Sequence, residues 1–372
     1  MTGDSSASAA GWVEHLRQGG TTPWSAWPDR TAPAPGAAPL LPGAQQLELL
    51  RRINLARGSA APDQGLADRV LATTAAGRGK ADLPLLGLPT TGFGPAPVDP
   101  ATVGAHELLR VASVLVADDL VALGADPAPA RWARPWRRRF RLVGDPVLAT
   151  GLREHLRGLG RPEGGPRPHV VALGAPLDEL LARTWTQRCF EHGSKPWAEW
   201  LRFWRERDQL PARVDLADSV RRWHPRRPLV RVVTDHDRLP RELGVRSLPS
   251  SLARVPGADQ AELARRVAAV VGLRVPTAER PSLMRTLQRR IPDSGVAPVG
   301  VPARERDWVA SSAARMTRQL TRAGYPVVGD LADLAPRSAP AAVTGADDEQ
   351  VLDLAIRMVV DPAWRTERQV RQ

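Results

Sequence analysis

The sequence predicts an α/β fold with a mostly parallel sheet and flanking helices, preceded by a helical N-terminal region. Short apolar runs typical of buried strands occur at 140–143, 169–174 and 229–234. Helical patterns separate these runs, and strands that alternate with helices form βαβ units whose strands run parallel. Upstream of Trp132 the chain shows helical patterns and Pro-rich loops instead.

The helices are predicted from apolar residues that recur every three or four positions. Gly124 and Gly324 are expected to end two of them, because glycine accepts the left-handed conformation that often follows a helix. A long helical region from Leu177 to Trp223 is expected between the second and third strands. The other expected helices are 12–16, 44–55, 106–123, 151–157, 260–272, 304–322 and 348–360.

These elements suggest four parts. Residues 1–43 form a flexible Pro-rich segment with one short helix, and residues 44–128 form a helical region. The α/β domain spans 129–337, and a helix with a tail occupies 338–372. A chain of 372 residues can bury a core of this size.

Arginine supplies nearly all the positive charge, since only Lys80 and Lys195 among the 52 basic residues are lysine. The net charge of +12 permits an anionic partner, but basic and acidic residues are interspersed, which favours a solvated surface. Cys189 is the single cysteine and the seven histidines show no metal-ligand spacing, so no metal site is expected. No long apolar run or signal peptide is present, so we expect a cytoplasmic protein without membrane insertion.

The first strand run leads into a turn and a helix, which is the layout of a phosphate-binding loop. Backbone N–H groups at such a helix start cradle an anion. However, Val147 stands where such loops carry a lysine, and Asp145 places a negative charge where the anion would sit. The competing interpretation is a strand-to-helix turn in which Asp145 caps the helix. The residues that keep the phosphate-loop pattern are Gly144, Pro146 and Thr150.

Two stretches of the α/β region resemble bacterial sulfotransferase-like proteins, and the order and spacing of their motifs carry the resemblance. The first comprises 169–185, 200–204, 220–223 and 230–234, and the second comprises 307–316 and 323–336. The resemblance covers a little over half of the chain, from about Phe140 to Pro336. It implies a P-loop-type α/β sheet that binds 3′-phosphoadenosine 5′-phosphosulfate.

The resemblance also implies where this cofactor would bind. The family's first loop usually reads Gly-x-Pro-Lys-Thr-Gly-Thr, whereas residues 144–150 read Gly-Asp-Pro-Val-Leu-Ala-Thr. The family's second phosphate site has an arginine near the position of Gly174 and Ala175, whereas the first arginine here is Arg183. The candidate cofactor-binding residues are therefore Gly144, Pro146, Thr150, Arg153 and Arg183.

Two functions are possible, and they differ in whether other residues replace the missing hydrogen-bond donors to the cofactor. Loss of one donor to developing negative charge commonly costs about 2.7–4 kcal/mol of transition-state stabilisation. The leading hypothesis is therefore a diverged, non-catalytic sulfotransferase-like protein with a binding or scaffold role, whose partner is a protein or an anionic or glycan substrate. The alternative is an active sulfotransferase for a carbohydrate or small-molecule acceptor, in which Arg141, Arg153 or Arg183 replaces the missing donors.

The densest positive charge runs from Arg131 to Arg141 and alternates with aromatic residues. Such a run suits binding of phosphates or single-stranded nucleic acid through charge and stacking, which defines a second alternative function. The competing interpretation is a linker whose tryptophans pack onto the sheet domain. Because no known nucleic-acid module surrounds the run, nucleic acid is not the expected partner. Its candidate anion- or partner-binding residues are Trp132, Trp136, Arg137, Arg138, Arg139 and Arg141.

Two further features concern histidine and tryptophan. His236 lies between Asp235 and Asp237 just after a strand, where open α/β sheets place their sites, so it is a candidate general base; a histidine in a turn is the alternative. The stretches 20–27 and 193–200 share Gly, Pro and two Trp at the same spacing, which indicates a partial duplication, a shared docking turn or coincidence. We expect these tryptophans to anchor the core rather than to bind carbohydrate.

Overall fold

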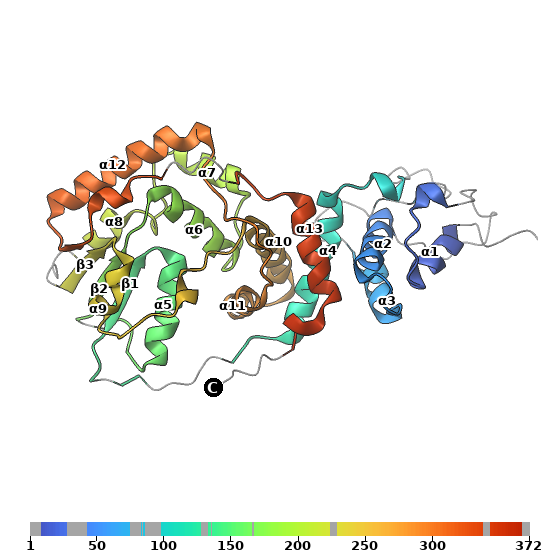
Figure 1. Ribbon diagram of the computed structural model, residues 1–372, viewed down its shortest axis with the longest axis horizontal. Coiled ribbons are helices and arrows are strands. Elements are labelled where there is room, and N and C mark those ends of the chain that lie inside the picture. Colours follow the sequence, from blue (N-terminus) through green and yellow to red (C-terminus); the bar gives the residue numbers. More distant parts are fainter. Residues whose placement is uncertain are drawn as a thin grey trace, which may run out of the picture. The chain divides into compact units, whose positions relative to one another are not determined.

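Figure 1 shows a computed structural model of the chain. Its described residues are 9–27, 43–74, 83, 85, 98–127, 133–134, 136–165, 167–223, 229–337 and 343–366.

The chain forms two compact units, and each is built from separate parts of the sequence. Unit 1 comprises Met1–Ala125, Glu262–Ser294 and Asp347–Gln372. Unit 2 comprises Asp126–Ala261 and Gly295–Ala346. The expected N-terminal helical region therefore shares its unit with two later segments, one of which lies inside the range expected for the α/β domain.

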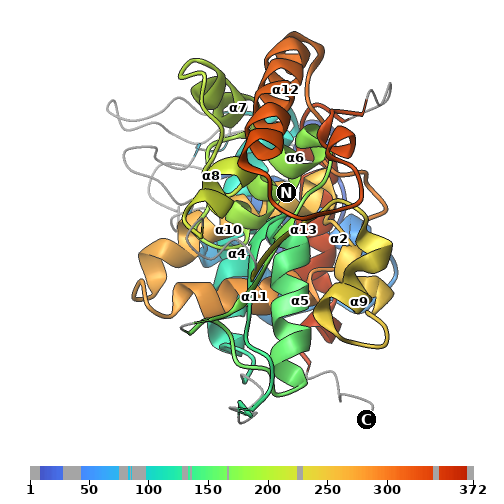
Figure 2. The same ribbon diagram turned by 90° about the vertical axis from the view of Figure 1, so that its left-hand side faces the viewer.

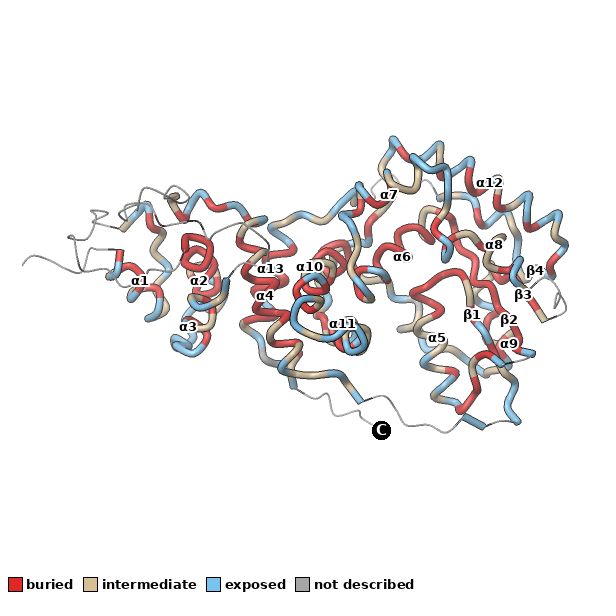
Figure 3. Tube along the Cα trace, turned by 180° about the vertical axis from the view of Figure 1, so that it is seen from behind, coloured by how far each residue is buried: buried red, intermediate tan, exposed pale blue. Residues whose placement is uncertain are grey.

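Unit 1 is helical in its described part, and its core lies around α4 (Ala105–Leu123). α4 packs against α13 (Asp348–Val360) and α2 (Ala44–Arg57), and Figure 3 shows α4 and α13 buried along much of their length. Gly124 follows α4 with a φ of 77°, so the expected stop is confirmed. The remaining helices of this unit are α1 (Ala9–Arg17), α3 (Gln64–Ala72), α11 (Arg280–Arg290) and most of α10 (Ala258–Arg274).

Unit 2 contains a four-stranded parallel sheet in the order β1-β2-β3-β4. The expected parallel sheet with flanking helices is confirmed, and all three expected strands are present. A fourth strand, β4, was not predicted because two residues are too short to show a pattern. The strands are β1 (Phe140–Gly144), β2 (His169–Leu173), β3 (Val230–Val233) and β4 (Val327–Val328).

Helices cover both faces of this sheet. On one face, α5 (Pro146–Gly158) and α9 (Leu239–Leu243) share an apolar cluster with β1, β2 and β3 (Figure 2). On the other face, Arg141 of β1 lies near Trp223, which follows the end of α8 (Leu216–Arg221). The Arg141 guanidinium is 5.2 Å from the centre of the Trp223 ring. α8 contacts β1 and β2, and α12 (Arg306–Ala323) packs against α8.

The expected helical region from Leu177 to Trp223 is divided into three helices. These are α6 (Leu177–Cys189), α7 (Trp197–Arg205) and α8. The break before α7 contains Gly193, whose φ is 77°, and Pro196 at the N-cap. Short 3₁₀ turns occur at Trp24–Ala26, Pro100–Thr102, His236–Arg238, Ser250–Ala253, Ala303–Glu305, Leu331–Leu334 and Pro362–Trp364.

The repeated tryptophan stretches form matching contacts, one in each unit. The indole N–H of Trp12 donates to the Thr22 carbonyl at 2.9 Å, and that of Trp185 donates to the Lys195 carbonyl at 2.9 Å. In both stretches the donor precedes its acceptor by ten residues. Trp24 of the first stretch packs against Trp12, and Trp197 of the second packs against Trp185. Trp24, Trp197 and Trp200 are buried and anchor cores as expected, whereas Trp27 is half-buried.

Candidate functional site

The turn after β1 forms because Gly144 and Asp145 follow the strand. Gly144 has a φ of 92°, and a Cβ there would lie 2.3 Å from the Leu173 carbonyl oxygen, so only glycine fits. Asp145 is fully buried, and its Oδ1 accepts the backbone N–H groups of Val147 and Leu148, each at 3.1 Å. Asp145 is thus the N-cap of α5.

A salt-bridge network extends from this cap into α6. The Arg183 Nη1 donates to the second oxygen of Asp145, and its Nη2 donates to Glu179 Oε2 at 2.6 Å. Glu179 Oε1 in turn accepts a hydrogen bond of 3.3 Å from Arg337 Nη1. The two oxygens of Asp145 are therefore occupied by the helix start and by the arginine that sequence reasoning assigned to a cofactor.

The candidate cofactor-binding residues separate into two groups. The first group lies at the turn after β1. Gly144 allows the turn, Pro146 lies in the first turn of α5, and Arg183 contacts Asp145. The Thr150 hydroxyl instead donates to the Pro146 carbonyl at 2.8 Å within the helix. Arg153 pairs with Glu163 at 2.8 Å. Of the arginines proposed to replace the missing donors, Arg183 alone has a described contact with this turn.

His236 lies at the carboxyl end of the sheet, as the sequence indicated. Its Nε2 lies 2.7 Å from the Gly174 carbonyl oxygen, and since a carbonyl only accepts, Nε2 carries the proton. His236 lines an open cavity of about 590 Å³, and Asp235, Asp330 and Asp333 also line it. Asp235 and Asp330 both cap 3₁₀ turns. In the described residues, no group of three or more His, Cys, Asp or Glu side chains has the arrangement to hold a metal ion.

The arginine-rich run reaches the surface at the start of β1. Trp136 is 77% exposed, and Arg137 and Arg138 are also exposed. Arg138 Nη2 lies 3.0 Å from Nδ1 of the buried His169. Arg139 is half-buried, whereas Arg141 stacks on Trp223. The remaining candidate, Trp132, lies outside the described residues.

Sequence reasoning missed that Arg161 lies inside this positive region. Arg161 is 6% exposed, and its Nε donates to the Arg138 carbonyl at 3.1 Å. Burial, followed by repulsion from Arg138 and Arg137, lowers the pKa of Arg161. Burial also lowers the pKa of His169 to about 4, with repulsion from Arg138, Arg231 and Arg161 as further causes. Positive charge thus accumulates at the amino-terminal end of the sheet.

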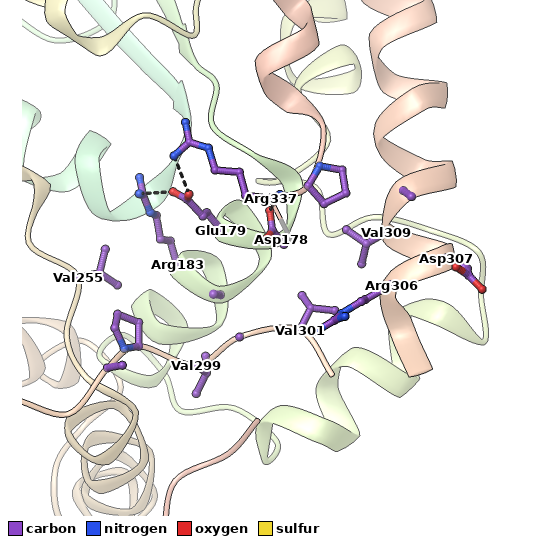
Figure 4. A pocket seen from close by; sticks show the side chains of 16 residues that line it. Asp178, Glu179, Arg183, Val255, Val299, Val301, Arg306, Asp307, Val309 and Arg337 are labelled. Carbon is purple, nitrogen blue, oxygen red and sulfur yellow. Dashed lines mark hydrogen bonds and ion pairs between the residues drawn. The ribbon is translucent and has the colours of Figure 1, made fainter. Parts of the chain in front are cut away.

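A cavity of about 620 Å³ lies in unit 2 near the Asp145–Arg183 pair. Figure 4 shows its lining, which comes from α6, residues 297–301, the start of α12 and residues 336–337. Four valines and two prolines belong to this lining, together with charged side chains from α6, the start of α12 and Arg337. No local pattern indicated this cavity, because the residues that line it are far apart in the chain.

No protein-family model matches this chain, and neither a curated protein nor a solved structure matches it. None of the helices in the described part of the chain combines the length and apolarity needed to cross a bilayer.

Proposed function

We propose that unit 2 is a diverged sulfotransferase-like domain that binds a partner and does not transfer sulfuryl groups. The observation that carries this proposal is the buried Asp145 carboxylate, which occupies two N–H donors at the start of α5 and pairs with Arg183. In a phosphate-binding loop these donors and a nearby cation would face the ligand. Here the Asp145 carboxylate, an internal anion, takes the place of the ligand.

Two physical costs oppose binding of a phosphate or sulfate at this turn. The ligand would meet the negative charge of Asp145 in a region shielded from water, where like charges repel strongly. It would also need to remove Asp145 from Arg183 and leave a buried carboxylate without its cation, which is strongly destabilising. Val147 offers no compensating charge.

Calorimetric titration with 3′-phosphoadenosine 5′-phosphate in low-phosphate buffer tests the proposal. We expect no saturable heat at millimolar nucleotide. Micromolar binding that is lost in Arg183→Met but kept in the matched variant Arg153→Met would overturn the proposal. That result would favour the alternative, an active sulfotransferase for a carbohydrate or small-molecule acceptor. Arg153 is a suitable control because it pairs with Glu163 and not with the turn.

A second candidate function, binding of a polyanion, is favoured by the exposed Trp136. An exposed indole beside arginines offers a base-stacking surface next to phosphate-binding cations. Fluorescence titration with a single-stranded oligothymidylate tests this function. Arg137→Ser should reduce the slope of log affinity against log salt concentration by about one, whereas Arg322→Ser on the exposed side of α12 should not. Salt-independent binding, or none, would exclude it.

A further inference from the structure

The 620 Å³ cavity of unit 2 has the size of a small-molecule site, since such sites typically enclose about 300–1,000 Å³. It goes beyond the function proposed above, because it is separate from the donors at the start of α5. Arg183 connects the two, because it lines the cavity and also contacts Asp145.

The apolar wall of the cavity suits a hydrocarbon or aromatic body. Val299, Val301 and Val309 lie on this wall and are otherwise buried, at 4%, 7% and 1% exposure. Val255 lies on another side of the cavity (Figure 4). Most of the apolar surface that a ligand can cover belongs to the exposed Ala297, Pro298 and Ala310 and to the half-buried Val255, and its removal from water is favourable.

The carboxylates on the opposite wall are already engaged. Asp178 Oδ1 accepts the backbone N–H of Arg337 at 3.2 Å. Glu179 accepts hydrogen bonds from both Arg183 and Arg337. Glu179 therefore has its positive partners within the protein and Asp178 already accepts a backbone hydrogen bond, so a cationic ligand gains little from them.

Arg306, the first residue of α12, differs from Arg183 and Arg337, which pair with Glu179. Its guanidinium makes no hydrogen bond or ion pair with any described residue. Figure 4 shows Arg306 extending toward Val301, whereas its neighbour Asp307 extends in the other direction. Arg306, which has no partner among the described residues, thus lies beside the apolar wall.

We propose that this cavity binds a small organic anion with an apolar body. The anionic group, a carboxylate, sulfonate or phosphate, accepts hydrogen bonds from the Arg306 fork, which matches the geometry of such groups. The apolar body lies against the apolar lining around Val255, Pro298 and Ala310. The charge of the ligand determines how the ligand is oriented, and the apolar lining makes the cavity prefer ligands with an apolar body.

Two fluorescent probes separate the contributions of charge and apolar contact. 8-Anilinonaphthalene-1-sulfonate carries an aromatic body and a sulfonate, whereas N-phenyl-1-naphthylamine has the same body without the charge. Arg306→Met should weaken binding of the sulfonate about ten- to a hundredfold, because a charge-assisted hydrogen bond is lost. It should change the affinity for the neutral probe less than about twofold. Arg304→Met is the matched control, since Arg304 pairs with Glu305 and does not line the cavity.

A second variant tests the location independently of charge. Ala310 is exposed and lines the cavity, so Ala310→Trp should fill it without disturbing the core and abolish binding of both probes. Ala314→Trp, one turn further along α12 and also exposed, should leave both affinities unchanged. The proposal is overturned if the wild-type chain shows no saturable sulfonate binding, or if Arg306→Met or Ala310→Trp binds it as the wild type does. None of these outcomes alters the nucleotide titration.

Discussion

Replacement of Asp145 and Arg183, singly and together, measures how strongly the internal pair stabilises unit 2. Asp145→Asn keeps an oxygen that can cap α5 but removes the charge. Arg183→Met keeps the apolar stem of the side chain and removes the cation. The two single variants should differ because the surroundings of the two partners differ.

Arg183→Met should be the more harmful change. It leaves the fully buried Asp145 carboxylate without a cation, and such a loss typically costs about 3–5 kcal/mol. Asp145→Asn leaves Arg183, whose side chain is 19% exposed, still paired with Glu179 at 2.6 Å. Its cost should be about 1–2 kcal/mol. The double variant should recover part of the loss, with a coupling energy of about 2 kcal/mol.

Native-state hydrogen exchange of peptides from α5 and α6 is a suitable assay, because it reports local opening free energies in a chain with two units. The Arg153–Glu163 pair is the matched control. Its side chains are 30% and 23% exposed, so its coupling should be about 0.5 kcal/mol. Additive effects of Asp145→Asn and Arg183→Met, or a larger cost for Asp145→Asn, would refute the assignment of a buried internal anion.

Three other expectations concern the fold around this site. Gly144→Ala should destabilise unit 2 by about 2–4 kcal/mol in the same exchange assay, because its positive φ and the nearby Leu173 carbonyl both exclude a Cβ; an unchanged exchange rate would contradict this. Because the pKa of His169 is lowered to about 4 when folded, its contribution to stability should be lost as pH falls from about 6.5 toward 4. Urea unfolding of His169→Gln should show a weaker pH dependence in that window, and an identical pH profile would argue against it. Trp12→Phe and Trp185→Phe should each cost about 1–3 kcal/mol by thermal and chemical unfolding, since each leaves a carbonyl unpaired, and a neutral effect of either would contradict the matching role of these indoles.

Local patterns predicted the sheet well because its strands are mostly apolar over four or five consecutive residues. His169–Leu173 is buried at every position, whereas Phe140–Gly144 and Val230–Val233 each include one arginine. β4 has only two residues and pairs with β3 alone, so its position depends on tertiary contacts that a local pattern does not contain. The same reason explains why the packing of Glu262–Ser294 with the N-terminal helices was not foreseen.

The candidate site was predictable only where a local rule applied. The cap formed by Asp145 follows from its position before Pro146, and it was one of the two interpretations that the turn allowed. Its contact with Arg183 spans 38 residues and depends on how α5 packs against α6. Arg306 gave no signal because an isolated arginine on an exposed helix is common, and its significance depends on the cavity beside it.

The repeated tryptophan stretches show how the same local rule gives different elements. In both, an indole N–H donates to the carbonyl just before a proline, so the turn itself is a property of the short sequence. After the proline, the first stretch forms a 3₁₀ turn, Trp24–Ala26, and the second forms α7. The second stretch also gains a hydrogen bond from Trp197 to the Gly300 carbonyl at 2.9 Å, beside the cavity. This hydrogen bond connects α7 to residues 297–301. Trp197 therefore lies next to the cavity that we propose binds an organic anion with an apolar body.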